Sequence, residues 1–505
     1  MSPRPARPLV PLACAAAAFA AFLPVLRNGF IDDWDDGANF STNPHIRGFS
    51  SSNLRWMLAA IHSGHYHPLT WLSIALDHAL WGLDPRGYHL TSLLLHCANV
   101  VLFYFIARRL FAEARPEAGE ADLETASALA ALLFGLHPLR VESVAWASER
   151  RDVLSGFFYL AALLFWLRRE GAAALACYAA SLLSKAMGVT LPFALLILER
   201  WPLRERRGWK EKAPFFALAA VAALVGFAAE IPNGAARALD ALPLSVRLGS
   251  AAYGLVFYLE KTVWPSRLVP IYGMPTDLRA YWPAFVASGV LAAAAACGVF
   301  LMRRRRPGLA AASAYYALTL APVLGLSHFG PQLVADRYSY LACLPLALLG
   351  AAPLTVRGAR RLLPAAAALC LALGALTWRQ ARTWRDSGTF WSHAAAADPG
   401  CWIARLYLGN HALAKRDYAG AERLYREAIE IDPLYAAAYG NLGAVLLQEK
   451  RPEAALSAFA RAQELSPDHP GIHGNMAAAL RAEGKVHEAA REARREREIT
   501  SGRSP

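Results

Sequence analysis

Four carboxylates directly follow the first long apolar run of the chain, Leu9 to Leu26. They are Asp32, Asp33, Asp35 and Asp36. Neighbouring negative charges repel one another, which raises the proton affinity of at least one member of such a cluster. A carboxylate of raised proton affinity is suited to act as a general base near neutral pH. We therefore predict Asp36 or Asp35 as a catalytic base, and the other two as solvated or helix-capping residues. A hydrated loop or an N-cap would also explain the pair.

Cationic side chains at the ends of later apolar runs could bind an anion. Lys185 ends one run, and Arg337 lies between two others. Arginine can hold a phosphate through two parallel hydrogen bonds, and lysine holds it as a point charge. Snorkelling or an ion pair, such as Arg337 with Asp336, explains both residues equally well.

A short segment before the fourth apolar run carries charges of both signs. Its members are Arg140, Glu142, Arg150, Arg151 and Asp152. Mutual salt bridges are the simpler expectation for such a mixture. Within it, Glu142 and Arg150 are the best candidates for binding a substrate.

Histidines supply the remaining polar candidates. His89 and His96 are two helical turns apart and share a helix face. Polar side chains within a membrane usually face the protein interior and are candidates for a functional site. We predict that His96, and His67 in the preceding loop, bind substrate, although a structural hydrogen bond would also explain His96. Carboxylates and histidines together could bind a divalent ion, but no ligand spacing requires one, so no metal is assigned.

The composition places these residues in a membrane protein. The chain has 505 residues, of which 56% are hydrophobic and 18% are charged, whereas soluble proteins carry roughly 25% charged residues. The net charge of +13 comes from arginines in short loops, which set topology and meet lipid headgroups rather than nucleic acid. The seven cysteines show neither zinc spacing nor a disulfide framework.

Eleven membrane spans are predicted. The first run, preceded by Arg4 and Arg7, is interpreted as a retained anchor rather than a cleaved signal peptide. The other ten lie at 90–107, 125–138, 153–167, 172–184, 189–199, 213–229, 282–301, 309–326, 338–355 and 362–378. Pro68 to Trp81 is too short to span and is predicted to be an interfacial helix. The segment from about Leu244 to Lys261 is predicted not to cross fully.

Loop charge then orients the chain. The most basic loops, Arg200 to Lys212, Arg303 to Arg306 and Arg357 to Arg361, are expected on the cytoplasmic side. The unusual polar residues are expected together on the outer face. They lie in Asp32–Asp36, at His67, and in His137–Asp152, Ser184–Lys185, Trp264–Tyr272 and Ala335–Tyr338.

A repeat follows the apolar region. Pro399, Pro433 and Pro467 recur at an interval of 34 residues, the period of the tetratricopeptide repeat. Small and aromatic residues recur at the same offsets, as in Gly409 with Tyr425 and in Gly443 with Phe459. We predict a membrane domain over 1–378, a connecting half-repeat over 379–401, and a repeat domain over 402–505. The last domain would hold two clear repeats and a degenerate capping repeat from about Pro470.

The order of these segments resembles the family of transmembrane and tetratricopeptide-repeat proteins, whose animal members are protein O-mannosyltransferases. The resemblance rests on Trp34-Asp35-Asp36, Asn43-Pro44, His67-Pro68-Leu69-Thr70-Trp71, His89–His96, His137–Trp146, Glu149–Asp152, Ser184-Lys185, Leu191-Pro192, Trp201-Pro202, Ala335–Tyr338 and the repeats. One departure is Arg151, at a position where many bacterial relatives are expected to have lysine. The small number of repeats is a second departure, because it leaves a small surface for an acceptor.

The resemblance implies an all-α fold of the GT-C type, a polytopic helical bundle followed by an α-solenoid. It implies a glycosyltransferase that moves a sugar, with mannose expected, from a polyprenyl-phosphate donor. The donor's phosphate would meet the cationic residues, and the repeats would bind an exported protein or glycan acceptor. No cofactor is implied beyond the lipid-linked donor. Composition favours a bacterial plasma membrane, with the active site and the repeats on the outer face.

A second interpretation is a non-enzymatic membrane scaffold, whose repeats recruit partners for envelope or polysaccharide assembly. A scaffold does not require carboxylates, histidines and cations to converge on one face, so we rank it second. A polymerase or ligase for glycans would share the transferase chemistry and differ only in its acceptor.

Overall fold

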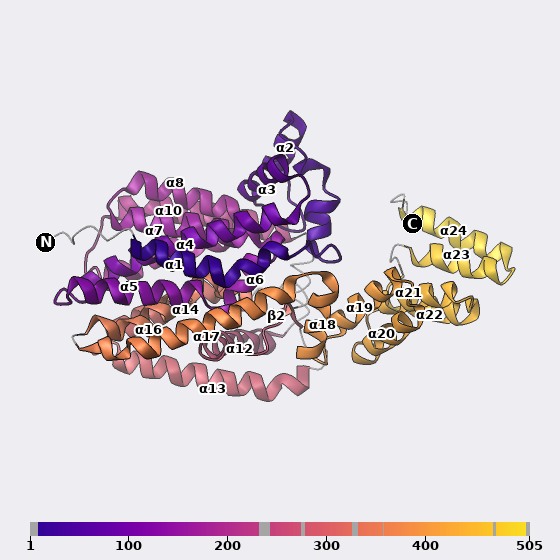
Figure 1. Ribbon diagram of the computed structural model, residues 1–505. Coiled ribbons are helices and arrows are strands. Elements are labelled where there is room, and N and C mark those ends of the chain that lie inside the picture. Colours follow the sequence, from indigo (N-terminus) through magenta and orange to yellow (C-terminus); the bar gives the residue numbers. More distant parts are fainter. Residues whose placement is uncertain are drawn as a thin grey trace. The chain divides into compact units, whose positions relative to one another are not determined.

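The computed structural model is nearly all helical, and its chain forms two compact units, Met1–Asp386 and Ser387–Pro505 (Figure 1). It describes residues 9–231, 243–273, 278–325, 332–356, 358–467 and 471–500. Arg4, Arg7 and Arg357, on which part of the predicted orientation rests, lie outside these ranges. The unit boundary falls within the predicted half-repeat 379–401, so that α18 (Ser387–Ala397) belongs to the second unit.

The first unit is a bundle around α1 (Leu9–Phe22), α4 (Pro85–Ala114), α5 (Glu120–Gly135) and α7 (Arg150–Leu167). Its other helices are α2 (Ser51–Ala59), α3 (Pro68–Trp81), α6 (Val141–Ala145), α8 (Gly171–Ser184), α9 (Leu191–Arg200), α10 (Trp209–Glu230), α12 (Leu244–Val263), α13 (Leu278–Met302), α14 (Pro307–Leu320), α15 (Ser339–Ala342), α16 (Leu344–Ala351) and α17 (Leu363–Ala381). Two short antiparallel strands, β1 (Tyr272–Gly273) and β2 (Gln332–Val334), also belong to it.

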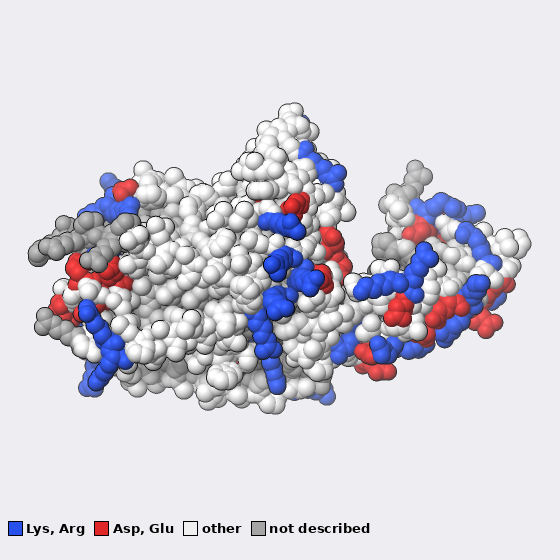
Figure 2. Space-filling model, viewed as in Figure 1, with Lys and Arg blue, Asp and Glu red and all other residues white. Residues whose placement is uncertain are grey.

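Five helical stretches of the described chain are long and apolar enough to cross a membrane. They are Leu9–Arg27, Pro85–Ala114, Trp209–Glu230, Arg279–Met302 and Ala359–Trp384. Two bent pairs would raise the number to seven. The predicted runs at 153–167, 172–184, 189–199 and 309–326 also contain helices, but these are shorter or more charged, and the total of eleven spans stays a prediction. Figure 2 shows charged side chains of this unit gathered towards its ends, with an uncharged band between them.

Local sequence explains where the helices near the polar residues begin and bend. Pro85 opens α4 at a position that needs no backbone N–H, and the Asp84 carboxylate caps the helix by accepting from the Arg86 N–H. Pro138 cannot continue α5, and the axis turns by 54° into α6. The His137 ring nitrogen Nδ1 accepts from the Leu139 N–H at this bend. The bend therefore carries the charged segment across one end of the bundle.

The second unit stacks pairs of antiparallel helices, as the 34-residue period predicts. They are α19 (Trp402–Ala414), α20 (Tyr418–Ile431), α21 (Ala436–Gln448), α22 (Pro452–Leu465), α23 (Ile472–Ala482) and α24 (Val486–Thr500). Each pair turns through one residue with positive φ, at Arg416, Lys450 and Gly484. These residues are also 34 apart, so the third pair is a true repeat in its backbone. Its predicted start at Pro470 lies outside the described residues.

Glycine and an aromatic ring fit together within each clear repeat. A Cβ atom on Gly409 would lie 2.5 Å from the Tyr425 ring, and one on Gly443 would lie 2.6 Å from the Phe459 ring. Both rings are fully buried. The absence of a side chain at the glycine lets the two helices of the pair approach closely, as the repeat pattern predicts.

This contact gives a stability test with a matched control on the same helix. Gly443→Ala should destabilise the second unit by about 1–3 kcal/mol, because its new methyl group overpacks the Phe459 ring. Gly440→Ala should stabilise it by about 0.5–1 kcal/mol, because nothing lies within 4 Å of a Cβ there and alanine favours a helix. Hydrogen exchange of α21 and α22 in the full chain measures both effects. Equal protection in the two variants would contradict this packing.

Candidate functional site

The segments predicted to share the outer face do converge at one end of the bundle. The first loop reaches the charged segment through Asp36 Oδ1, which accepts from Ser148 Oγ at 2.5 Å. Thr70 Oγ1 donates to the Ser184 carbonyl at 2.9 Å. The Tyr272 hydroxyl donates to Asp336 Oδ1 at 2.8 Å. Residues more than 100 positions apart are therefore brought into contact in this polar region.

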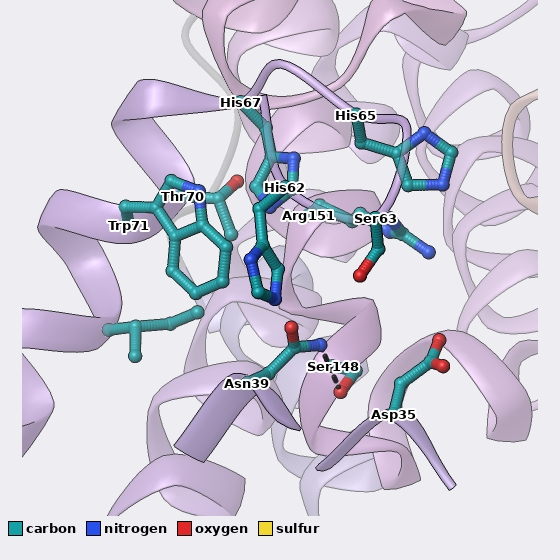
Figure 3. A pocket seen from close by; sticks show the side chains of 11 residues that line it. Asp35, Asn39, His62, Ser63, His65, His67, Thr70, Trp71, Ser148 and Arg151 are labelled. Carbon is teal, nitrogen blue, oxygen red and sulfur yellow. Dashed lines mark hydrogen bonds between the residues drawn. The ribbon is translucent and has the colours of Figure 1, made fainter. Parts of the chain in front are cut away.

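A cavity of about 110 Å³ opens in this region (Figure 3). Its lining consists of Asp35, Asn39, His62, Ser63, His65, His67, Thr70, Trp71, Ile74, Ser148 and Arg151. Figure 3 shows His62, His67 and Trp71 on one wall and Asp35, Asn39 and Ser148 on the other. Of the predicted site residues, Asp35 and His67 line the cavity.

The two neighbouring aspartates have different surroundings. Asp36 is 1% exposed, and its carboxylate accepts three hydrogen bonds, from the Ile31 N–H, the Ser148 N–H and the Ser148 hydroxyl. Asp35 is exposed at the cavity, and its carboxylate accepts no hydrogen bond from any described residue. The geometry therefore gives Asp36 a structural role in joining two loops and leaves Asp35 available to a ligand.

Both aspartates bind a proton more readily than an ordinary aspartate. Burial raises the pKa of Asp36 to about 7, although its three hydrogen bonds act in the opposite direction. Desolvation by the surrounding protein also raises the pKa of Asp35. The positive charge of Arg151 opposes this shift, and the negative charge of Glu149 adds to it. The pKa of both aspartates shifts in the predicted direction, but the predicted cause was wrong, because desolvation and not repulsion within the cluster is the main cause.

A buried carboxylate stands at the centre of the charged region. Glu149 is fully buried and contacts three cations: Arg151 at 2.7 Å, Lys185 at 2.8 Å and Arg337 at 3.3 Å. Burial alone would raise its pKa, but attraction by these cations holds the pKa well below its usual range. Glu149 therefore remains ionised and gathers side chains from three separate segments.

Lys185 and Arg337, predicted to bind phosphate, are already held in ion pairs. Lys185 Nζ also lies 2.6 Å from Asp152 Oδ1. Arg337 forms a short ion pair with Glu142, and its backbone N–H donates to the same carboxylate at 2.8 Å. The suggested pair of Arg337 with Asp336 was wrong, because Glu142 is the partner instead. The expectation of mutual salt bridges within this segment is wrong for Glu142, Arg150 and Asp152, because they pair outside it, with Arg337, Asp77 and Lys185 respectively. Glu142 does not line the cavity.

Arg150 lies away from the cavity. It is 1% exposed and pairs with Asp77 at 2.7 Å. Its Nε and Nη1 donate to the Ser92 and Ser73 hydroxyls, and the Nη2 that pairs with Asp77 also donates to the Tyr88 carbonyl. With these donors committed, Arg150 joins α3 and α4 to α7 rather than meeting a substrate. The choice of Arg150 as a binding residue is not supported.

The histidines also divide into two groups. His96 lies inside the bundle, with Nδ1 2.9 Å from the Tyr340 hydroxyl and Nε2 3.1 Å from the Gly135 carbonyl. His89 lies 3.4 Å from the Gly29 carbonyl. His96 is therefore structural here, as the alternative for it allowed, whereas the Nδ1 of His89 is buried without a partner among the described residues. Neither ring lines the cavity. His67 lines it, together with His62 and His65.

Several functional candidates were missed at the level of sequence. Arg151, His62, His65, Asn39 and Ser148 line the cavity but were not chosen. The spacing of His62, His65 and His67 within one loop was a signal that could have indicated them. Within the described ranges, no three His, Cys, Asp or Glu side chains are arranged to hold a metal ion.

Comparison with known proteins supports the resemblance. A tetratricopeptide repeat family model matches residues 391–436 and 408–470. Protein O-mannosyl-transferase Tmtc3 of Drosophila melanogaster is 28% identical over 166 residues, which cover 28% of this chain and 18% of that protein. Protein O-mannosyl-transferase tmtc2 of Xenopus laevis is 36% identical over 116 residues, which cover 22% and 13%.

A longer alignment joins the chain to protein O-mannosyl-transferase F38B6.6 of Caenorhabditis elegans. It has 24% identity over 462 residues and covers 82% of this chain and 61% of that protein. The crystal structure of MamA protein matches 23% of this chain and 63% of its own, with 19% identity and a TM-score of 0.22.

The chain thus aligns with less than a fifth of the length of the first two relatives, and with less than two thirds of the third. The resemblance expected from the sequence is nevertheless confirmed. The chain is similar to protein O-mannosyl-transferases, and its C-terminal unit carries tetratricopeptide repeats.

Proposed function

We propose that this chain is a membrane glycosyltransferase that moves a sugar, with mannose the first candidate, from a polyprenyl-phosphate donor to a hydroxyl group. The names of its relatives support a transferase of this class. The apolar helices support a multi-pass membrane protein. The acceptor would be an exported protein or glycan bound by the repeats. The site and the repeats would lie on the outer face of a bacterial plasma membrane.

One observation carries the proposal. Asp35 is the carboxylate that is both exposed in the cavity and without a hydrogen-bond donor among the described residues. A general base must be free to accept a proton from the attacking hydroxyl. Its raised pKa brings its proton affinity towards the working range of a base at neutral pH. Asp35 would remove the acceptor's proton as the acceptor oxygen attacks the sugar's anomeric carbon.

The departing phosphate needs a cation, and Arg151 fits this role. Arg151 lines the cavity, and its Nε and Nη2 donate hydrogen bonds to the Glu149 carboxylate. Its Nη1 donates to no described residue, so part of the guanidinium can bind an oxygen of the phosphate. Lys185 and Arg337 would act through Glu149, which they hold in place, and not by direct contact.

Asp36 offers a second route for the proton. The Ser148 hydroxyl connects Asp36 to the cavity, because it donates a hydrogen bond to Asp36 and Ser148 lines the cavity. An acceptor proton could pass through Ser148 to Asp36. The same assay can separate this route from direct removal by Asp35.

The first test measures sugar release from radiolabelled polyprenyl-phosphate sugars by detergent-purified protein, with a cell extract as acceptor. Asp35→Asn should lower the rate at least about 100-fold, because the base is lost while the shape is kept. Asp33→Asn, outside the cavity, is the matched control and should remain active.

Ser148→Ala distinguishes the two routes. If Asp35 removes the proton directly, Ser148→Ala should retain most of the activity. If the proton passes through Ser148, both Ser148→Ala and Asp36→Asn should lose activity. A folded wild type that consumes no donor, while its repeats still capture an envelope partner, would favour the scaffold interpretation instead.

A second test concerns Arg151. Arg151→Gln should raise the KM for the donor about tenfold or more, because a charge-assisted hydrogen bond to phosphate is lost. Arg151→Lys keeps the charge and should recover much of that loss. Steady-state kinetics at varied donor concentration measure both. An unchanged donor KM in folded Arg151→Gln would exclude Arg151 from the phosphate site.

A third test follows from the pKa of Asp36, which burial raises to about 7 from an ordinary value of 3.8. The folded protein then binds this proton more tightly than the unfolded chain does. The stability that Asp36 contributes is complete below its ordinary pKa of 3.8 and is lost as the pH rises from there to about 7. The unfolding temperature of wild type relative to Asp36→Asn should therefore fall between about pH 4 and pH 7 and stay level above that range. A difference independent of pH would contradict this.

A further inference from the structure

The two walls of the cavity have different chemistry. One wall presents the Asp35 carboxylate, the Asn39 amide and the Ser148 hydroxyl, with Arg151 nearby. The other wall presents the rings of His62, His65 and His67, which we call the histidine wall. These three histidines come from the loop that leads into α3. The proposed proton removal and phosphate binding use the first wall and leave the histidine wall without a role.

His67 is the best-defined member of the histidine wall. It is 7% exposed and stacks on the Trp71 ring, with the ring centroids 4.8 Å apart and the planes 27° apart. Trp71 is itself fully buried, so the position of the His67 ring is fixed by packing. A ring held in this way can present its polar edge to a ligand at little entropic cost.

That polar edge has no hydrogen-bond partner among the residues that the structure describes. Neither ring nitrogen of His67 bonds to any described residue, and Nδ1 is fully shielded from solvent. Nε2 of His62 is also buried without a partner. Buried polar atoms are normally hydrogen-bonded, and an exception needs an explanation, of which a group bound at that place is one. Two unsatisfied nitrogens lining one cavity therefore indicate a ligand with several hydrogen-bonding groups.

The electrostatics indicate that this ligand is uncharged where it meets the histidines. Burial and the nearby Arg151 charge lower the pKa of His67 well below its usual value and that of His65 to about 3. Burial also lowers the pKa of His62. Neutral imidazoles offer one donor and one acceptor each, and they do not attract an anion as a histidinium would.

A metal ion suits this wall less well. A catalytic metal site needs about three protein ligands around one point. No such group of side chains is present in the described part of the chain. The Arg151 guanidinium would also repel a dication placed in the cavity.

We propose that the histidine wall binds hydroxyl groups of the hexose ring being transferred, with His67 as its principal hydrogen-bonding residue. This assignment rests on the proposed transferase function and specifies its sugar subsite. Asp35, Ser63 and His65 lie exposed at the cavity, so the ring need not be fully enclosed. A hydroxyl-rich ring matches paired donors and acceptors, and the phosphate would point towards Arg151.

The test uses the full-length protein in detergent micelles and saturation-transfer difference NMR with methyl α-mannopyranoside as the probe. Wild type should transfer saturation to the ring protons, with no added metal. His67→Phe keeps the stacking on Trp71 but removes both nitrogens, and should weaken binding about fivefold to tenfold. His67→Gln restores hydrogen-bonding groups and should recover part of the signal. His78→Phe, on α3 but outside the cavity, is the matched control and should bind as wild type does.

Several outcomes would overturn the assignment. The first is that wild type shows no saturation transfer to any of a panel of methyl hexosides. The second is equal transfer in wild type and His67→Phe. The third is transfer that requires added Mn²⁺ and is lost with His67→Phe. The last result would make the wall a metal site. Binding is measured without donor or acceptor. Sugar binding lost with His67→Phe, in a protein that consumes no donor, would therefore support the subsite and reject only the transferase.

Discussion

The attraction of three cations to the buried Glu149 carboxylate is the interaction on which the polar end of the bundle depends. Arg151, Lys185 and Arg337 come from separate parts of the chain and meet on its two oxygens. A buried charge is costly unless it is paired, and removing one partner of a buried pair typically costs about 3–5 kcal/mol. The ion pairs with Asp152 and Glu142 extend the network, so that every long cationic side chain around Glu149 is balanced.

A few polar atoms at the cavity have no hydrogen-bond or ion-pair partner among the described residues. Asp36, Arg150 and His96 form hydrogen bonds or ion pairs with other protein groups. These contacts fix their positions and leave them unavailable to bind a ligand. Asp35, part of the Arg151 guanidinium and the His67 ring are held beside these engaged groups but are not themselves satisfied. A site of this kind combines fixed geometry with unsatisfied bonding capacity, which a reacting ligand needs.

Much of this arrangement could be predicted from the sequence, and the failures have a physical reason. Loop charge and apolar runs predicted that the first loop, the 137–152 segment and Lys185 share one face. The repeat pattern predicted that Gly443 lets the two helices of its pair approach closely. The sequence could not show which of two adjacent aspartates turns inward, since that depends on the Ser148 hydrogen bonds formed across the fold. The roles of Arg150 and Glu149 were missed for the same reason, because partners such as Asp77 are distant in sequence.

The left-handed residue in each repeat turn has an evolutionary consequence. Arg416 and Lys450 occupy positive φ without glycine, and Gly484 does so in the third repeat. Each 34-residue segment therefore carries its own turn, and the two clear segments also carry their own glycine–aromatic contact. Duplication of such a segment would add a complete module whose core is already packed. The repeat region could thus be lengthened by whole segments while the residues around Glu149 stay the same.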